Sequence, residues 1–280
     1  MNRKRFQART LARRTPAFVA ALVLSLLICG VALAQVINPQ PIQTYYVPLA
    51  EDDALVAMQA TNSNATAPVY TYLSIAIGSL DGTFVYYDQW ENGYDADIAN
   101  PTDLYGPGNA DGTQVWGNGI AADGCAPNRD GKTPLACTDA NDLLTGGNVV
   151  VLSNPVDPTT LQSVIDFDGG DKLGASKQVA VSRLYWPQTP RTLLAGAIEL
   201  LPTNKWGVSY MSPVGEGENT GVDPNNDEDG DFNNMFEYTS MFIQAFQPNT
   251  VVTVDVNGGA PGGTSSYTLQ PVSYTHLDEC

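Results

Sequence analysis

The sequence predicts an all-β protein made of two tandem β-sandwich units, the second of them truncated. Short runs rich in β-branched and aromatic residues recur with Gly, Pro, Asn and Asp between them. Many of these runs alternate apolar and polar residues with a period of two, as half-buried strands do. In addition, one pair of runs recurs 167 residues further along the chain.

We expect strands over eleven runs of this kind, taken in chain order. They are residues 44–47, 55–60, 69–77, 83–90, 149–152, 163–167, 178–185, 195–200, 207–211, 236–246 and 250–256. Residues 54–60 also fit a short helix, but no segment combines helical spacing, an N-cap and a Gly stop over three turns. Short strands at turn-rich spacing are typical of β-sandwiches.

The recurring pair defines the domain boundaries that we expect. Residues 72–77 and 83–88 resemble residues 239–244 and 250–255, although any two hairpins share some likeness. We therefore place a first unit at 35–200 and the start of a second at 201–270. The first contains a Gly-, Asn-, Asp- and Pro-rich insertion loop at 92–146, and loops of that length are functional or disordered.

The N-terminal 34 residues have the pattern of a secretory signal peptide. Six basic residues precede an apolar run at 17–33, and Ala32 and Ala34 suit cleavage before Gln35. A retained anchor is the alternative, while a lipoprotein site at Cys29 is disfavoured because Ile28 precedes it. We expect a secreted or cell-surface protein that contacts the membrane only through this leader.

The expected mature chain is strongly acidic. With the leader removed, seven basic residues remain against thirty acidic ones, a formal charge of −23. Such a chain repels phosphate backbones, which argues against a nucleic-acid partner. It suits divalent cations or a salty exterior, and plain solvation of an exported protein explains the charge equally well.

Cysteine use and the C-terminal residues complete the compositional picture. An oxidising exterior predicts a disulfide between Cys125 and Cys137. Residues 271–280 resemble a translated sequencing-adaptor tail, so we expect them to be non-native and the natural C-terminal part to be missing. His276 and Cys280 then carry no meaning, and the body of the chain has no histidine.

The missing histidine argues against an enzyme. It removes Ser-His-Asp relays, Cys-His pairs and His-based zinc sites. A pair of carboxylates can still hydrolyse glycosides, but nothing in the spacing singles out such a pair among thirty acids.

An acidic loop at 223–234 is the best candidate for a calcium site. Oxygen ligands recur at alternate positions around Gly230, as calcium requires: Asn225, Asp227, Asp229, Asp231 and Asn233. The loop resembles those of EF-hand and dockerin repeats, but Phe236 stands at the twelfth position and Glu237 comes one place late. The alternative is a solvated acidic loop.

Aromatic residues beside carboxylates form the candidate ligand site. Aromatic faces and carboxylates are how proteins hold sugars, and the candidates are Trp90, Glu91, Tyr94 and Trp116. Because Asn92-Gly93 is a strong turn signal, the same string also fits a purely structural turn. The carboxylates of 166–171 likewise fit either a cation site or a turn in which Asp accepts backbone N–H groups.

Two stretches resemble the IgGFc-binding N-terminal-like domain: Ser176–Val181, and Leu201-Pro202 followed by Trp206–Tyr210. This family comprises β-rich modules of secreted mucin-like animal proteins and large bacterial surface proteins, and the likeness spans about 47–253. It implies that Lys177 lies at a strand entrance, that Val179 and Val181 share a face, and that Trp206 anchors the next strand in the core.

The resemblance implies a non-catalytic extracellular binding or adhesion module of a larger protein, with an unknown protein or glycan ligand. The alternatives are a carbohydrate-active enzyme or its sugar-binding accessory domain, and a structural spacer stiffened by calcium.

Overall fold

The computed structural model describes residues 41–48, 68–78, 80–156, 167–187, 196–211, 241–255, 263–270 and 274–277. These residues form β-strands and two short 3-10 helices, η1 (Ala121–Asp123) and η2 (Thr203–Lys205). The all-β prediction is therefore confirmed. No helix in these ranges is long and apolar enough to cross a membrane.

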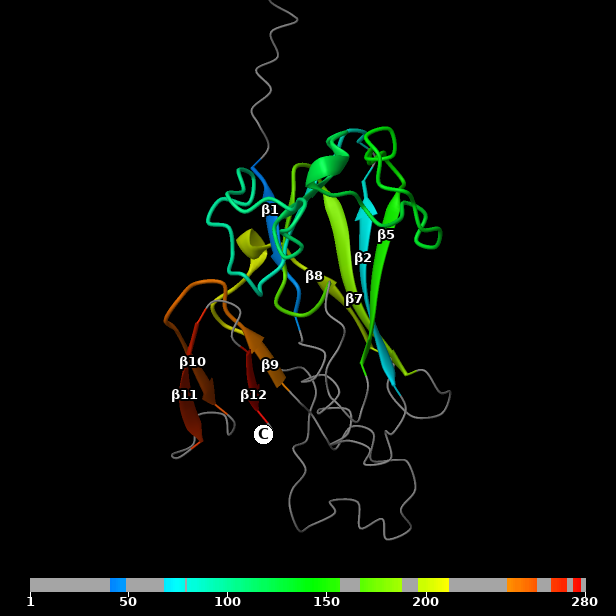
Figure 1. The fold of residues 1–280 in the computed structure, drawn as a ribbon. Helices are drawn as coiled ribbons and strands as arrows, with labels where there is room; N and C mark the ends of the chain where they lie inside the picture. Colours follow the sequence, from blue (N-terminus) through cyan, green and yellow to red (C-terminus); the bar gives the residue numbers. More distant parts are fainter. Residues whose placement is uncertain are drawn as a thin grey trace, which may run out of the picture. The chain divides into compact units, whose positions relative to one another are not determined.

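Two four-stranded antiparallel sheets contain the strands between residues 43 and 200. Sheet A has the order β1 (Gln43–Tyr46), β6 (Lys172–Ala175), β3 (Val85–Asp88) and β4 (Gln114–Trp116). Sheet B has the order β5 (Val149–Val156), β2 (Val69–Ile77), β7 (Val179–Pro187) and β8 (Gly196–Leu200). Figure 1 shows β5, β2 and β7 side by side in sheet B.

The inward faces of these sheets share one hydrophobic core, which makes the fold a β-sandwich. In β2 every second residue is buried, as period-two alternation requires. Leu73 and Ile75 of β2 lie in one buried cluster with Leu173 of β6 and Tyr87 of β3. Burying each such side chain contributes ~1.5–3 kcal/mol, so this cluster is the main source of stability.

The remaining strands lie after residue 240. β9 (Met241–Gln244) pairs with β12 (Tyr274–Leu277), and β10 (Thr250–Asp255) pairs with β11 (Thr264–Leu269). The recurring pair of runs does not form hairpins. β2 and β3 lie in different sheets, and so do β9 and β10.

Most predicted strands are present, and the errors have local causes. Residues 207–211 form no strand, because Trp206 follows η2 and turns its Nε1 back to the Leu201 carbonyl oxygen at 2.9 Å. Trp206 is only partly buried and does not begin a core strand as the resemblance implied. By contrast, Val179 and Val181 are both buried in the core, as expected. The runs at 55–60 and 163–166 lie outside the described residues.

The segment expected to be an insertion loop contains β4 and is held together by its own carboxylates. Asp142 is 1% exposed and accepts hydrogen bonds from the backbone N–H groups of Gly117, Gly119 and Ile120. Cys125 and Cys137 form the predicted disulfide, with their Cα atoms 5.5 Å apart. Many acidic residues here are therefore structural acceptors rather than ligands for a partner.

The first part of this segment, residues 94–113, covers the outer face of sheet A, and we call it the covering segment. Ile98 is 5% exposed and lies directly over Gly174 of β6. A Cβ atom at position 174 would stand 2.9 Å from Ile98 Cγ2 and 3.1 Å from Ile42 Cγ2. Gly174 thus lets the covering segment lie close to the sheet.

Candidate functional site

The candidate site lies where β3 ends and the covering segment begins, on the outer face of sheet A. Cross-strand pairing places Lys172 of β6 opposite Tyr46 of β1 on one side and Asp88 of β3 on the other. The three side chains form a row across the sheet, because directly opposed residues point to the same face.

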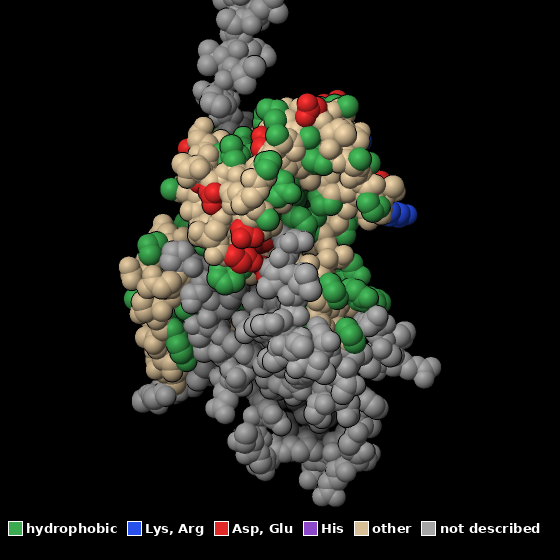
Figure 2. Space-filling model, in the orientation of Figure 1, with side chains coloured by type: hydrophobic (Ala, Val, Ile, Leu, Met, Phe, Trp, Pro, Cys, Tyr) green, Lys and Arg blue, Asp and Glu red, His purple; other side chains and the backbone are tan. Residues whose placement is uncertain are grey.

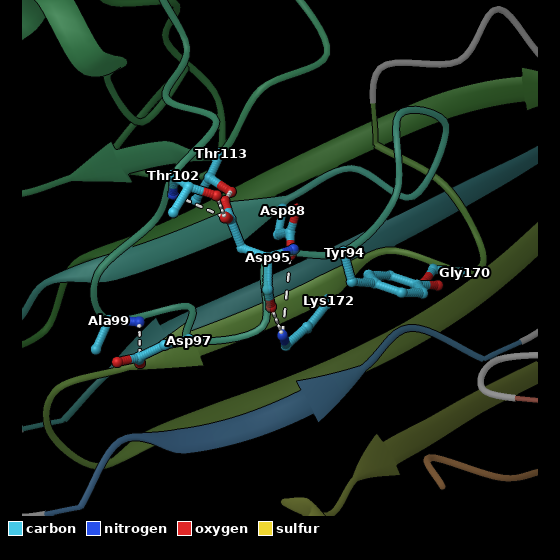
Figure 3. A network of polar contacts seen from close by, with 9 residues as sticks. All are labelled: Asp88, Tyr94, Asp95, Asp97, Ala99, Thr102, Thr113, Gly170 and Lys172. Carbon is cyan, nitrogen blue, oxygen red and sulfur yellow. Dashed lines mark hydrogen bonds and ion pairs between the residues drawn. The ribbon is translucent and has the colours of Figure 1, made fainter. Parts of the chain in front are cut away.

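Lys172 and Asp88 are both joined to Asp95 in the covering segment (Figure 3). Lys172 Nζ donates to the Asp95 carbonyl oxygen, and the Asp95 N–H donates to Asp88 Oδ2 at 3.0 Å. Lys172 Nζ also lies 4.0 Å from Asp88 Oδ2, with side chains 9% and 2% exposed. The segment therefore closes over a buried ion pair.

The Asp95 side chain organises the segment around this pair. Its carboxylate accepts hydrogen bonds from the Thr102 N–H and hydroxyl groups and from the Thr113 hydroxyl. Burial raises the pKa of Asp95, but the hydrogen bonds from Thr113 and Thr102 outweigh it and leave that pKa lowered.

Burial shifts the pKa values of Asp88 and Lys172 in opposite directions. It raises the pKa of Asp88 to about 6, although the Asp95 N–H and Lys172 both favour the carboxylate. It lowers the pKa of Lys172, against the attraction of Asp88 and Asp95. The fold thus weakens the preference of both side chains for their charged forms.

A tight turn at Trp90–Gly93 lies next to this network. The Gly93 N–H donates to the Trp90 carbonyl oxygen at 3.0 Å, and Gly93 has φ 98°. Trp90 packs on Gly170, where a Cβ atom would stand 2.9 Å from Trp90 Cδ1, yet its side chain remains 46% exposed. Tyr94 donates its hydroxyl hydrogen to the Gly170 carbonyl oxygen at 2.5 Å, which fixes the other end of the turn.

Tyr94 also begins a chain of aromatic contacts. Its ring lies edge-on to Tyr46 at 5.7 Å between centroids, and Tyr46 lies 6.3 Å from Trp206. Trp206 in turn meets Phe246 edge-on at 5.6 Å. Tyr94 is therefore packed among aromatic rings, whereas Trp90 packs on Gly170 and keeps its ring half-exposed.

Of the four residues predicted to bind a ligand, the structure brings three together. Trp90, Glu91 and Tyr94 share the turn, and Glu91 is exposed. Trp116 lies in the core instead: it is 0% exposed and stacks on Tyr87 at 5.2 Å. Trp116 belongs to β4, in which all three residues are buried, so its ring does not reach the surface. The Gly-, Asn- and Asp-rich composition of the segment gave no sign of this strand.

A second polar cluster lies inside the sandwich and contains Asp168 and Asp171 of the 166–171 run, together with Tyr87, which the sequence did not join to them. Tyr87 donates its hydroxyl hydrogen to Asp171 Oδ2 at 2.5 Å, and the Asp168 N–H donates to the same oxygen at 2.9 Å. Asp171 is 1% exposed, and burial, followed by the nearby Asp168 charge, raises its pKa well above the usual carboxyl range. Arg183 of β7, 0% exposed, lies near enough to lower the pKa of Tyr87.

These contacts bear on whether residues 166–171 form a cation site or a turn in which Asp accepts backbone N–H groups. Asp171 acts as an acceptor for a backbone N–H group, as the turn interpretation expects, while Asp166 lies outside the described residues. Asp171 Oδ1 is buried and has no hydrogen-bond partner. In the part of the chain that the structure describes, no group of three or more His, Cys, Asp or Glu is placed to hold a metal ion.

The predicted calcium ligands Asn225, Asp227, Asp229, Asp231 and Asn233 lie outside the described residues. Figure 2 shows acidic side chains at several places on the face that it presents, and basic ones at one margin.

Comparison with protein-family models, with curated proteins and with solved structures finds no match.

Proposed function

We propose that the chain is a non-catalytic extracellular binding or adhesion module of a larger surface or secreted protein, and that it contacts its ligand through the Trp90–Tyr94 turn. The observation that carries this is the half-exposed indole of Trp90, which packs on Gly170 and is followed in the turn by the exposed Glu91. An immobilised aromatic ring next to a carboxylate stacks on a sugar ring and hydrogen-bonds to its hydroxyls at little entropic cost.

A glycan is therefore the ligand class that this geometry favours over a flat protein surface. The buried carboxylates next to the turn do not suit hydrolysis. Asp88 and Asp95 are buried and engaged in structural hydrogen bonds, so this pair offers no exposed acid and base flanking a substrate.

Binding of the fluorescently tagged chain to a printed glycan array, together with incubation on a panel of polysaccharides, tests this function. We expect binding to at least one glycan and no release of reducing ends. Turnover would instead support the carbohydrate-active enzyme, and binding to no glycan would leave the calcium-stiffened spacer as the better account.

We also propose that the chain contains two tandem sandwich units. This is supported by the β10–β11 sheet, which lies within residues 201–270 and is separate from sheets A and B. Calorimetry tests it: two independent units predict a calorimetric enthalpy larger than the van't Hoff enthalpy, and equal enthalpies would contradict them.

A further inference from the structure

We propose that Lys172 and Asp88 become joined by an intramolecular amide, or isopeptide, bond between Lys172 Nζ and Asp88 Cγ. This bond would link strands β6 and β3 covalently across sheet A. It goes beyond the binding function and does not depend on it.

Position and burial bring the two groups together. Direct cross-strand pairing sets Lys172 opposite Asp88, and their side chains are 9% and 2% exposed with Nζ and Oδ2 4.0 Å apart. Asp95 holds both, because its carbonyl oxygen accepts from Lys172 Nζ and its N–H donates to Asp88 Oδ2. Reactants fixed side by side in this way react as if at very high concentration.

Amide formation needs a neutral amine and a protonated carboxyl group, and this surround favours both. Burial lowers the pKa of Lys172 and raises that of Asp88 to about 6, so transfer of one proton from Nζ to the carboxylate gives the reactive pair. Keeping two charges buried is costly, and their neutralisation removes that cost.

The reaction balances within the site. The Nζ lone pair attacks Asp88 Cγ, a C–N bond forms and the C–O bond to the hydroxyl group breaks. That hydroxyl group leaves with one amine hydrogen as water. No oxidant or cofactor is consumed.

Thr113 lies close to the reacting groups. Its hydroxyl donates to Asp95 Oδ2 at 2.6 Å, and its proximity to Asp88 lowers the pKa of that carboxyl group, though less than burial raises it. The covering segment, with the Tyr94 ring 6.0 Å from Lys172 Nζ, keeps bulk water from reversing the reaction.

Mass spectrometry of the purified full chain tests the bond directly. We expect the wild type to be lighter than its sequence by one water, beyond the hydrogens lost to the disulfide. Trypsin should fail to cut after Lys172 and should release one branched peptide containing both Lys172 and Asp88.

Variants exclude other dehydrations, because Asp-Gly pairs such as Asp81-Gly82 also lose water by forming succinimides. Lys172→Arg and Asp88→Ala should each retain the water. Lys177→Arg is the matched control. The partly exposed Lys177 also donates to an aspartate carbonyl oxygen, that of Asp81, and this variant should lose water like the wild type.

A wild-type chain of full mass that trypsin cuts after Lys172 would overturn the proposal and reduce the pair to an ion pair. Because the mass and the digest are measured on the unaltered protein, this test is valid even if a variant fails to fold.

Discussion

Gly170 determines where the Trp90 side chain lies in the candidate site. Its φ is 114°, a conformation that L residues rarely adopt, and Trp90 covers it closely enough to exclude a side chain. Both the backbone and the contact therefore demand glycine, and the pose of Trp90 depends on it.

We expect Gly170→Ala to lower the free energy of unfolding by ~2–4 kcal/mol, since positive φ and the Trp90 contact each add to the cost. Gly147→Ala is the control: Gly147 has φ 88° but nothing within 4 Å of a Cβ atom. Urea unfolding of both variants separates backbone strain from contact. Equal losses would show that Trp90 does not depend on Gly170.

Asp171 makes stability depend on pH. Its pKa is raised in the fold, so its contribution is fully present below the unfolded carboxyl pKa and is lost as pH rises through the folded pKa. Asp171→Asn keeps an oxygen for Tyr87 and removes the titration.

Urea unfolding between pH 4 and 8 should show the wild type losing stability relative to Asp171→Asn as the pH rises. A stability difference between the two proteins that stays constant, or that grows in favour of the wild type, would contradict this.

At the scale of elements, sheet A is covered on its outer face as well as packed on its inner one. The covering segment reaches the sheet through Ile98 on Gly174 and through Asp95 on Lys172. The Ile98 contact is apolar and the Asp95 contact is polar. Both bury part of a segment whose composition alone predicts a loop.

Gly174→Ala should destabilise the protein by ~1–3 kcal/mol, because the new methyl group would stand 2.9 Å from Ile98 Cγ2. In a double-mutant cycle with Ile98→Ala, the second change should recover part of that loss. Chemical denaturation of the four proteins measures the coupling. Additive losses would mean that Ile98 does not press on position 174.

The sequence predicted elements better than it predicted the site. Alternation over 69–77 gave β2 residue for residue, because one face of that strand is buried and the other is not. β4 was missed because only three residues pair within a Gly-rich stretch, and Trp116 was misplaced with it. The Lys172–Asp88–Asp95 network joins residues far apart in the chain, and only strand register brings them together.

At the scale of the whole molecule, the described part of the chain is a sandwich in which many carboxylates accept hydrogen bonds from within the fold. We propose that the acidic residues of 223–234 bind calcium. Mature chain with millimolar calcium should unfold several degrees higher than without it, because a ligand at ~100 times its dissociation constant adds ~2.7 kcal/mol.

The calcium effect should disappear in Asp227→Asn/Asp229→Asn and persist in Asp111→Asn, which removes an exposed charge elsewhere. Differential scanning fluorimetry measures the midpoints. A wild-type midpoint that calcium leaves unchanged would return this loop to plain solvation.

The most direct test of the proposed function compares two exposed tryptophans on the glycan array. Trp90 is 46% exposed at the site, and Trp186, 60% exposed, lies on β7 of the other sheet. Trp90→Ala should abolish glycan binding with the fold intact by circular dichroism, while Trp186→Ala should bind as the wild type does. Unchanged binding by Trp90→Ala would contradict the account.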